Sequence, residues 1–586
     1  MKKHIFYLFI ISIIMASCNN TSKESKGAGS GDQAFQSLTD NFLEGYLKWR
    51  PQTSVALGFH EYDGKTTDLS KSSIAGEVAR LKSVDSSLAL FDTTSLSPNM
   101  FRDYRILRMG IHNELFNIVD LGEYTKNPMN YAGAIDVNIY VKRNFGPIEN
   151  RVKSIIAIEN EAHNIFAAAR ANLQDSLAKP YIETAIEVAK GSADFLGGDL
   201  ITALKDVKDT ALMASFNKAN KQAIEEVKSF ADYLEKEKLP KAHTHYAIGV
   251  DNYKKMLLDV EGITLTPDQI LEIGMKELKK EQDVFNATAK IIDQKKNPVD
   301  VYHDMQKEHP TAEDLIPDAK KHLEAIRQFL IDKKIVTMPS EVRVKVEETP
   351  QYARASSTAS MDTPGPFETK ATEAYYYITP VDPKWTDKQK SDWLSQFDYY
   401  TTDNVTIHEA YPGHYTQFLH LNASSATKLE KIFGSYAYIE GWAHYCEKMM
   451  ADEGYGHNGD SITGAKYRLA QSGDALLRLC RLCVSIQTHC HSISVDSATK
   501  FFMANWYQGD KPSRQEALRG TFDPGYLFYT IGKLEILKLR EDYKKQEGSA
   551  FTLQKFHDAM LDNGMPPIFL LREILLKDKS IWGQTL

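Results

Sequence analysis

The residues best suited to catalysis lie in one short segment, His408-Glu409-Ala410-Tyr411-Pro412-Gly413-His414. A hydrolytic zinc site uses three protein ligands, one open position for water, and a nearby carboxylate that takes a proton from that water. His408 and His414 supply two imidazoles, which zinc binds readily, and Glu409 supplies the carboxylate. The segment therefore predicts a zinc-dependent hydrolase with Glu409 as the general base. Histidine and glutamate ligands also accept manganese, cobalt or iron, so zinc is the expected metal and not the sole possibility.

The spacing of these two histidines departs from the familiar zinc helix, His-Glu-x-x-His, by two residues. Six residues of regular helix turn through about 600°, which leaves the second imidazole about 120° from the face of the first. Pro412 has no N–H to donate, and Gly413 tolerates backbone angles that other residues avoid. We therefore expect a bulge at Tyr411-Pro412-Gly413 that returns His414 to the side of His408. The alternative is a surface helix that holds two histidines by chance and ends at Pro-Gly.

A third ligand is expected from Glu440, in the segment Tyr436-Ala437-Tyr438-Ile439-Glu440-Gly441-Trp442-Ala443-His444-Tyr445. This carboxylate interrupts an apolar and aromatic helix, and a buried charge is costly without a cation or a hydrogen-bond donor. His444 lies four residues later on the same face, where it is expected as a hydrogen-bond partner of the site or as a substitute ligand. A solvent-facing glutamate on an amphipathic helix is the alternative for Glu440.

A second group of metal-binding residue types lies in Cys480-Arg481-Leu482-Cys483 and the following His489-Cys490-His491. The paired spacing of a zinc ribbon is missing, and leucine, valine and isoleucine side chains surround the cysteines. Buried helical thiols, including Cys446, are therefore expected in preference to a metal site. A disulfide within the group stays an alternative, because the compartment predicted below permits one.

The N-terminus predicts export. Lys2 and Lys3 precede an apolar run, residues 5–16, that is too short to span a bilayer. The end of this run, Ile14-Met15-Ala16-Ser17-Cys18, resembles the bacterial lipobox, so residues 1–18 are expected to be a lipoprotein signal with a lipid anchor on Cys18. Residues 19–33 have the composition of a flexible tether. The predicted location is the cell envelope, with the outer membrane or periplasm favoured, and an ordinary cleaved signal is the alternative.

The rest of the chain predicts a mainly helical fold with a small sheet. The apolar residues between Ile155 and Leu173 recur at helical spacing, and Thr266-Pro267-Asp268-Gln269 has the pattern of a capping box. The best strand patterns are Val342 to Val346 and Ala374 to Thr379. A Thr-, Ser- and Pro-rich stretch, residues 347–373, is expected to be a loop bordering the catalytic cleft. It separates a predicted helical lobe, residues 34–346, from a predicted catalytic lobe, residues 347–586.

The two metal motifs resemble those of the family catalogued as domain of unknown function 885, zinc-peptidase-like proteins common among bacterial lipoproteins. The resemblance runs from about residue 35 to 575 and includes looser matches at residues 247–253 and 556–558. It implies a helical fold akin to the zincin peptidases with a glutamate third ligand, the gluzincins, with zinc in a deep cleft. It assigns His408, His414 and Glu440 to zinc and Glu409 to water activation.

The resemblance also points to the segment Tyr529-Thr530-Ile531-Gly532 near the end of the chain. A phenol at Tyr529 is expected to stabilise the oxyanion of a tetrahedral intermediate, with Tyr526 as the rival for this role. Arg519 is a candidate clamp for a substrate carboxylate, and a structural ion pair is its default role.

These features predict a zinc metallopeptidase that acts on short or unfolded peptides, and residues 373–379 are a candidate strand for pairing with the substrate by edge addition. Two alternatives stay open: a zinc hydrolase of another amide or ester, and a non-enzymatic helical lipoprotein whose His/Glu set is degenerate. The net charge of −8, with acidic and basic residues interspersed, makes nucleic acid an unexpected partner. The oligomeric state is not predicted.

Overall fold

The computed structural model describes residues 29–350, 354 and 358–586. The predicted signal, the lipobox with Cys18 and most of the tether therefore lie outside the described residues. The first described helix, α1, begins at Asp32, close to the predicted end of the tether at residue 33. Within the described part of the chain, no helix is long and apolar enough to cross a membrane.

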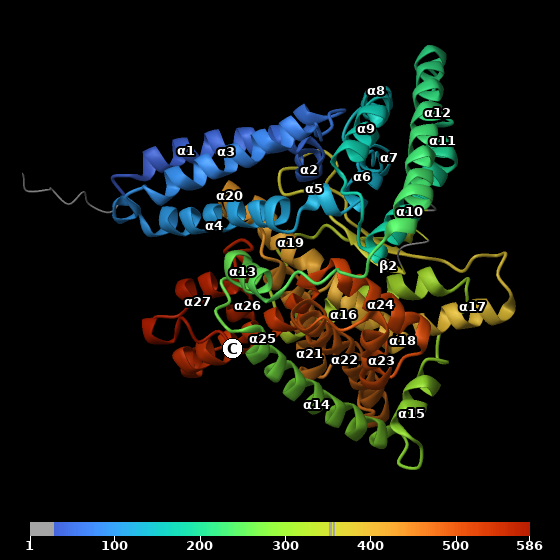
Figure 1. Ribbon diagram of the computed structural model, residues 1–586. Coiled ribbons are helices and arrows are strands. Elements are labelled where there is room, and N and C mark those ends of the chain that lie inside the picture. The colour runs from blue at the N-terminus through green and yellow to red at the C-terminus, as the bar shows by residue number, and fades with distance from the viewer. Residues whose placement is uncertain (1–28, 351–353, 355–357) are drawn as a thin grey trace, which may run out of the picture.

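Helices make up most of the structure, as predicted, and most of those before residue 234 form two groups in the upper part of Figure 1. The blue group contains α1, α3 and α4, and the cyan and green group contains α8 to α12. The helices up to residue 333 are α1 (Asp32–Trp49), α2 (Pro51–Leu57), α3 (Lys71–Ala89), α4 (Pro98–Leu115), α5 (Glu123–Lys126), α6 (Met129–Ala132), α7 (Ile139–Lys142), α8 (Ile148–Asn160), α9 (Ala162–Asn172), α10 (Lys179–Gly197), α11 (Asp199–Leu204), α12 (Thr210–Tyr233), α13 (Val250–Glu261), α14 (Pro267–Ile292), α15 (Pro298–Met305) and α16 (Leu315–Lys333).

The helices of the second half lie mostly in the lower part of Figure 1, where α14 runs along their margin, although α20 lies beside α4. They are α17 (Asp387–Leu394), α18 (Tyr399–Glu409), α19 (His414–Ala423), α20 (Lys428–Ile432), α21 (Tyr436–Asp452), α22 (Ser461–His491), α23 (Val495–Trp506), α24 (Asp510–Phe522), α25 (Phe528–Glu547), α26 (Leu553–Leu561) and α27 (Ile568–Leu575).

Local sequence signals account for several of these elements. Thr266 caps α14 and exchanges hydrogen bonds with Gln269, which confirms the predicted capping box. The apolar stripe from Ile155 to Leu173 is buried, although it is divided between α8 and α9. The helical pattern therefore predicted the buried face but not the interruption between the two helices.

The sheet has three strands in the order β1-β3-β2. β1 (Lys345–Glu348) runs parallel to β3 (Tyr375–Ile378), and β2 (Ala359–Asp362) runs antiparallel to it. Both predicted strands are present, β3 within one residue at each end and β1 displaced by two to three residues, whereas β2 lies in the stretch predicted to be a loop. Because β3 is paired on both sides, the prediction that residues 373–379 pair with substrate by edge addition is wrong. The two edge strands of the sheet are β1 and β2.

Packing crosses the position between residues 346 and 347 where the sequence predicted a division into lobes. One buried apolar cluster combines Leu278 and Phe285 of α14 with Leu476 and Leu482 of α22. The carboxylate of Glu261, the last residue of α13, accepts hydrogen bonds from Ser435 Oγ and from the backbone N–H of Ala437 at the start of α21. The first half of the chain therefore helps to hold a helix that carries part of the candidate site. The division into two lobes stays a prediction.

Candidate metal centre

The two histidines lie on separate helices that meet at a break. α18 ends at Glu409, and α19 begins at His414 after four intervening residues. The predicted bulge within one continuous helix is therefore wrong in form, although the distortion is where Pro412 and Gly413 predicted it. A Cβ on Gly413 would lie 1.8 Å from the carbonyl oxygen of His408, so no larger residue fits at this position. The N–H of Gly413 instead donates to the carbonyl of Ile407, at 3.0 Å.

The break is also tied to the helix that carries the third candidate ligand. The indole N–H of Trp442 on α21 donates to the carbonyl oxygen of Pro412 at 2.9 Å, and Trp442 is completely buried. Ser435 caps α21 by accepting a hydrogen bond from the N–H of Tyr438. These contacts fix the distance between the break and Glu440, one turn into α21.

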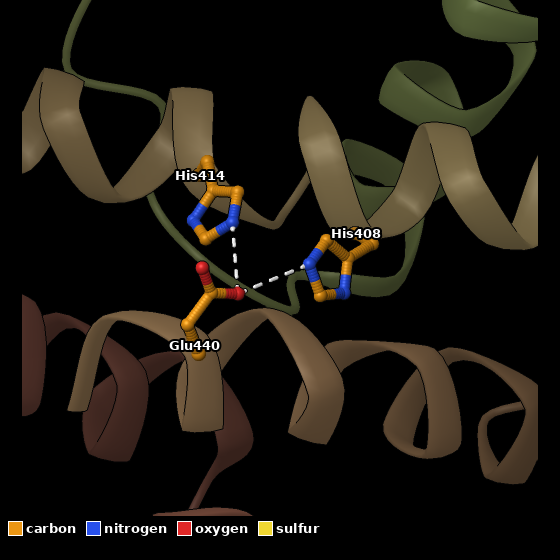
Figure 2. Close-up of side chains that lie close together, drawn as sticks. All are labelled: His408, His414 and Glu440. Carbon is orange, nitrogen blue, oxygen red and sulfur yellow. Dashed lines mark ion pairs between the residues drawn. The ribbon is translucent and has the colours of Figure 1, made fainter. Parts of the chain in front are cut away.

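The three predicted ligands converge, as Figure 2 shows. One Nε or Oε atom from each of His408, His414 and Glu440 lies within 4.8 Å of the others. Glu440 Oε2 is 3.4 Å from His408 Nε2 and 3.5 Å from His414 Nε2. Their side chains are 7%, 12% and 18% exposed, so the group is enclosed but reached by solvent. In the described part of the chain this is the one group of three such residues placed to share a metal ion.

The geometry of this group fits a zinc ion. For ligand bonds of about 2.1 Å, tetrahedral coordination places neighbouring ligand atoms about 3.4 Å apart, which matches the separations of Glu440 Oε2 from both imidazoles. Glu440 Oε2 is buried and has no hydrogen-bond partner among the described residues. This oxygen faces the two ring nitrogens but forms no hydrogen bond with either. A cation shared by the three atoms would compensate its buried charge.

A carboxylate that the sequence analysis missed orients His408. Glu447 Oε1 lies 2.7 Å from His408 Nδ1, and its other oxygen lies 3.0 Å from His444 Nδ1. Arg478 approaches Glu447 at 3.5 Å. A carboxylate on the far nitrogen of a metal-binding histidine fixes the tautomer that presents Nε2 to the metal. The sequence contained one signal for this role. Glu447 follows Glu440 by seven residues, about two helical turns, so both side chains lie on the same face of α21.

His444 is not a substitute ligand. Its Nδ1 contacts Glu447, and its Nε2 lies 3.3 Å from Lys533 Nζ on α25. Burial and the Lys533 ammonium lower the pKa of His444 to about 3, so its ring is neutral. The predicted role as a hydrogen-bond partner of the site is therefore the one that the structure favours, by way of Glu447.

The electrostatics of His408 show how strongly negative its surroundings are. Burial opposes protonation of the ring, yet Glu440 and Glu447 on its two sides raise the pKa of His408 to about 10. The same burial would raise the pKa of Glu440, but His414 and His408 hold it well below its usual range. These groups favour a positive charge in the space that they share.

Glu409, the predicted base, lies at the free edge of the sheet. Its Oε2 accepts a hydrogen bond from the N–H of Met361 on β2 at 3.2 Å. This N–H points away from β3, so Glu409 occupies the side of β2 on which a further strand would pair. The stretch predicted to border the site therefore does so as a strand.

Of the two predicted tyrosines, Tyr529 is the one beside the candidate ligands. Its ring stacks on that of His408 with centroids 6.3 Å apart, and the carboxylate of Glu440 is close enough to raise its pKa further after burial has done so. Tyr526 is completely buried, and its hydroxyl lies so close to α24 that a Cβ on Gly520 would be 2.2 Å from it. Tyr526 thus faces a different helix, and the geometry favours Tyr529.

A close contact of two helices sets the position of Tyr529. A Cβ on Gly532 of α25 would be 1.8 Å from the carbonyl oxygen of Ala437, and a Cβ on Gly441 of α21 would be 2.5 Å from the Gly532 backbone. The two backbones therefore touch directly next to Glu440 and one turn from Tyr529. Neither glycine was recognised from the sequence as a packing residue.

Arg519 forms an ion pair with Asp523 at 2.9 Å, the default role given to it from the sequence. Its guanidinium also lies 6.0 Å from the centroid of the Tyr529 ring. Arg519 therefore lies next to the Tyr529 ring. Its predicted role as a clamp for a substrate carboxylate stays a prediction.

The cysteine-rich segment forms part of α22, and its cysteines form no disulfide among the described residues. Cys446, Cys480 and Cys483 are completely buried among apolar side chains. Both ring nitrogens of His489 are already used, because Nδ1 accepts from the N–H of Ile248 at 3.4 Å and Nε2 donates to the carbonyl of Gly520 at 2.8 Å.

The comparisons with known proteins agree with this architecture. A family model described as "Bacterial protein of unknown function (DUF885)" matches residues 51–575. A solved structure from Shewanella oneidensis, described as a candidate lipoprotein of unknown function, is 23% identical with a TM-score of 0.77 and covers 93% of this chain and 100% of its own. A second candidate lipoprotein, from Colwellia psychrerythraea, is 18% identical with a TM-score of 0.76 and covers 95% and 100%. These likenesses establish the fold, and no curated protein matches the chain.

Proposed function

The chain belongs to the DUF885 family of bacterial proteins of unknown function, and we propose that it is a zinc metallopeptidase that cleaves short or unfolded peptides. The observation that carries the proposal is the convergence of His408, His414 and Glu440 around an unpartnered carboxylate oxygen, with Glu409 beside them. Three ligands with one remaining position are typical of catalytic zinc, whereas structural zinc has four protein ligands. The gluzincin-like cleft is part of the proposal.

In this proposal the residues have separate roles. A bound zinc ion supplies Lewis acidity to the water and to the scissile carbonyl. Glu409 takes the proton of the attacking water and later delivers it to the leaving amine. Tyr529 donates a hydrogen bond to the developing oxyanion, and Glu447 keeps His408 oriented. Tyr526, the other candidate for the role of Tyr529, is not part of the proposal, because it is buried against α24.

The substrate is placed at the free edge of β2. An extended peptide paired with β2 would lie alongside Met361, whose N–H already contacts Glu409. Main-chain hydrogen bonds hold a peptide without regard to most of its side chains, so we expect broad sequence tolerance. The limited exposure of the ligands restricts access to segments that are short or unfolded.

We also propose that a lipid on Cys18 anchors the protein to the cell envelope, with the outer membrane favoured over a soluble periplasmic form. The lipobox-like end of the apolar run supports this anchor, and the two similar solved structures are of proteins described as candidate lipoproteins. The tether that follows is long enough to let the folded part reach substrates away from the membrane surface.

The decisive experiment replaces the proposed base and follows turnover and metal together. In Glu409→Gln we expect kcat on a peptide library to fall by about 10²–10⁴-fold, because proton transfer is lost, while the metal content stays at one equivalent. Glu347→Gln, an exposed glutamate on β1, is the matched control and should leave both values unchanged. Unchanged turnover in Glu409→Gln would remove Glu409 from the mechanism.

Two further measurements separate the alternatives. Parallel assays with peptides and with matched ester or non-peptide amide substrates distinguish a peptidase from a zinc hydrolase of another class. Metal analysis of protein purified without added zinc distinguishes both from a non-enzymatic lipoprotein, because a stoichiometric absence of any divalent metal contradicts every enzyme proposal based on this site.

A further inference from the structure

A cavity of about 370 Å³ lies among the helices of the first half of the chain, apart from the candidate metal centre. It is lined by residues of α1, α2, α4, α5 and α6, which meet near the labels α2 and α5 in Figure 1. None of the residues lining it belongs to the candidate metal centre. Its volume is in the range of small-ligand sites, and its walls are mostly polar.

Two amide side chains of the lining each use one of their two N–H donors on a backbone carbonyl. Gln52 Nε2 donates to the carbonyl of Ala134 at 2.7 Å, and Asn130 Nδ2 donates to the carbonyl of Glu123 at 3.1 Å. Because a carbonyl can only accept, these two contacts fix which end of each amide is nitrogen. The amide oxygens of Gln52 and Asn130 receive no donor from the described residues.

Two further donors of the lining, on Tyr46 and Trp49, are also occupied. The Tyr46 hydroxyl donates to Glu114 Oε1 at 3.0 Å, and the Trp49 indole donates to Ser73 Oγ at 3.1 Å. Arg50 divides its guanidinium between Glu77, at 2.7 Å, and Glu114. Its guanidinium also covers the ring of Tyr46, at 4.2 Å from the centroid. The amide oxygens of Gln52 and Asn130 and the carboxylate of Glu123 therefore stay available as acceptors for a ligand.

The charge of the lining is unbalanced. Its charged side chains are Arg50, Glu114 and Glu123, and Arg50 is already shared between Glu77 and Glu114. The Glu123 carboxylate has no ion pair among the described residues, and burial together with Glu114 raises its pKa to about 7. A carboxylate enclosed without a cation is costly unless a ligand supplies the positive charge.

We propose that this cavity is a binding site for a small primary amine, whose ammonium pairs with Glu123 and donates to the free amide oxygens of Gln52 and Asn130. A primary ammonium has three N–H donors and no acceptor, which complements a lining that is rich in acceptors. Arg50 lies over the rings of Tyr46 and Trp49, at 4.2 Å and 4.7 Å, so the faces it covers are not open to a quaternary amine. This site goes beyond the proposed hydrolase and does not depend on it.

The test is calorimetric titration of the full-length protein with putrescine, 1,4-butanediol and tetramethylammonium. The diol has the same chain length without the charge, and tetramethylammonium has the charge without N–H donors. We expect saturable binding of putrescine, with the diol and tetramethylammonium at least about tenfold weaker. Equal binding of putrescine and the diol, or no binding of putrescine at millimolar concentration, overturns the proposal.

A variant links the binding to this cavity. Glu123→Gln should weaken putrescine by at least about tenfold, because the charge is removed and the size is kept. Glu187→Gln, an exposed glutamate on α10, is the control and should bind as the unchanged protein does. Thermal melting shows whether Glu123→Gln is folded, and we expect it to be at least as stable, since an enclosed charge is lost. Full affinity in a folded Glu123→Gln places the amine elsewhere and overturns the proposal.

A free amine and the lysine side chain of a peptide carry the same ammonium. Nα-acetyl-lysine amide is therefore titrated beside putrescine. Tighter binding of putrescine identifies a free amine as the ligand, and tighter binding of the lysine derivative identifies a peptide side chain. Binding of either one that is abolished by Glu123→Gln supports the ammonium site.

Discussion

Two regions in the second half of the chain contain the residue types that bind zinc, yet the structure treats them in opposite ways. In the candidate metal centre, His408, His414 and Glu440 direct atoms into one space, and the carboxylate oxygen nearest to both imidazoles lacks a partner. In the cysteine-rich part of α22, both nitrogens of His489 are hydrogen-bonded, and the thiols of Cys480 and Cys483 are buried in an apolar cluster. Convergence of unsatisfied atoms, and not residue type, separates a candidate metal site from a packed core.

The largest expected effect concerns metal retention. Glu440→Gln keeps the size of the side chain and removes its charge, so we expect metal affinity to fall by more than about 100-fold, beyond the loss seen when only a supporting group is changed. Cys480→Ser is the matched change in the other region and should retain the full metal content. Elemental analysis after dialysis against a weak chelator measures both. Retention by Glu440→Gln, or loss from Cys480→Ser, would reverse the comparison.

A smaller effect is expected from the carboxylate behind His408. Glu447→Gln should weaken metal binding by about 10–100-fold, because His408 loses the partner that fixes its tautomer. Competition with a chromogenic chelator measures the affinity, and Glu453→Gln, just after the end of the same helix, is the control. A lower melting temperature with unchanged metal affinity would assign Glu447 to structure alone.

A third prediction tests the buried histidine of the other region by the pH dependence of stability. Burial lowers the pKa of His489 to about 4 from an unfolded value near 6.5. Between these values the unfolded chain binds a proton that the folded chain does not, so the stability that the neutral ring contributes is complete above pH 6.5 and is lost as the pH falls toward 4. The expected loss is at most about 3 kcal/mol.

Urea unfolding of the unchanged protein and of His489→Asn, at pH 7 and at pH 4.5, measures this loss. Asparagine does not titrate, so the stability difference between the two proteins should shrink as the pH falls. A stability difference that is the same at both pH values would show that His489 does not titrate in this range. The pKa of His489 would then no longer distinguish the cysteine-rich part of α22 from the candidate metal centre.

The sequence predicted the candidate site best where local chemistry decides the structure. Pro412 and Gly413 were sufficient to predict a distortion between the two histidines, because one lacks a donor and the other a side chain. They did not distinguish a bulge from a break, since that depends on the Trp442 contact from another helix. The choice between Tyr526 and Tyr529 also depends on tertiary packing, because nothing near either residue in the sequence shows which one faces His408.

What escaped prediction is mostly non-local. β2 has no alternating pattern, and its pairing with β3 and its contact with Glu409 join segments far apart in the sequence. The same holds for the packing of α14 against α22, which a boundary placed from composition alone could not foresee. Capping boxes, buried stripes and the two longer strand patterns were predicted because each is determined within a few residues.

The glycine contact between α21 and α25 has a consequence for how the proposed enzyme moves. At Gly441 and Gly532 backbone meets backbone, with no side chain between them that could change its rotamer. The helices that carry Glu440 and Tyr529 therefore behave as one rigid frame. Admission of a substrate and release of products must then be accommodated on the β2 side of the site, because the break between α18 and α19 is itself tied to α21 through Trp442. In this arrangement α21 and α25 form the fixed side of the site, and β2 forms the side that opens and closes.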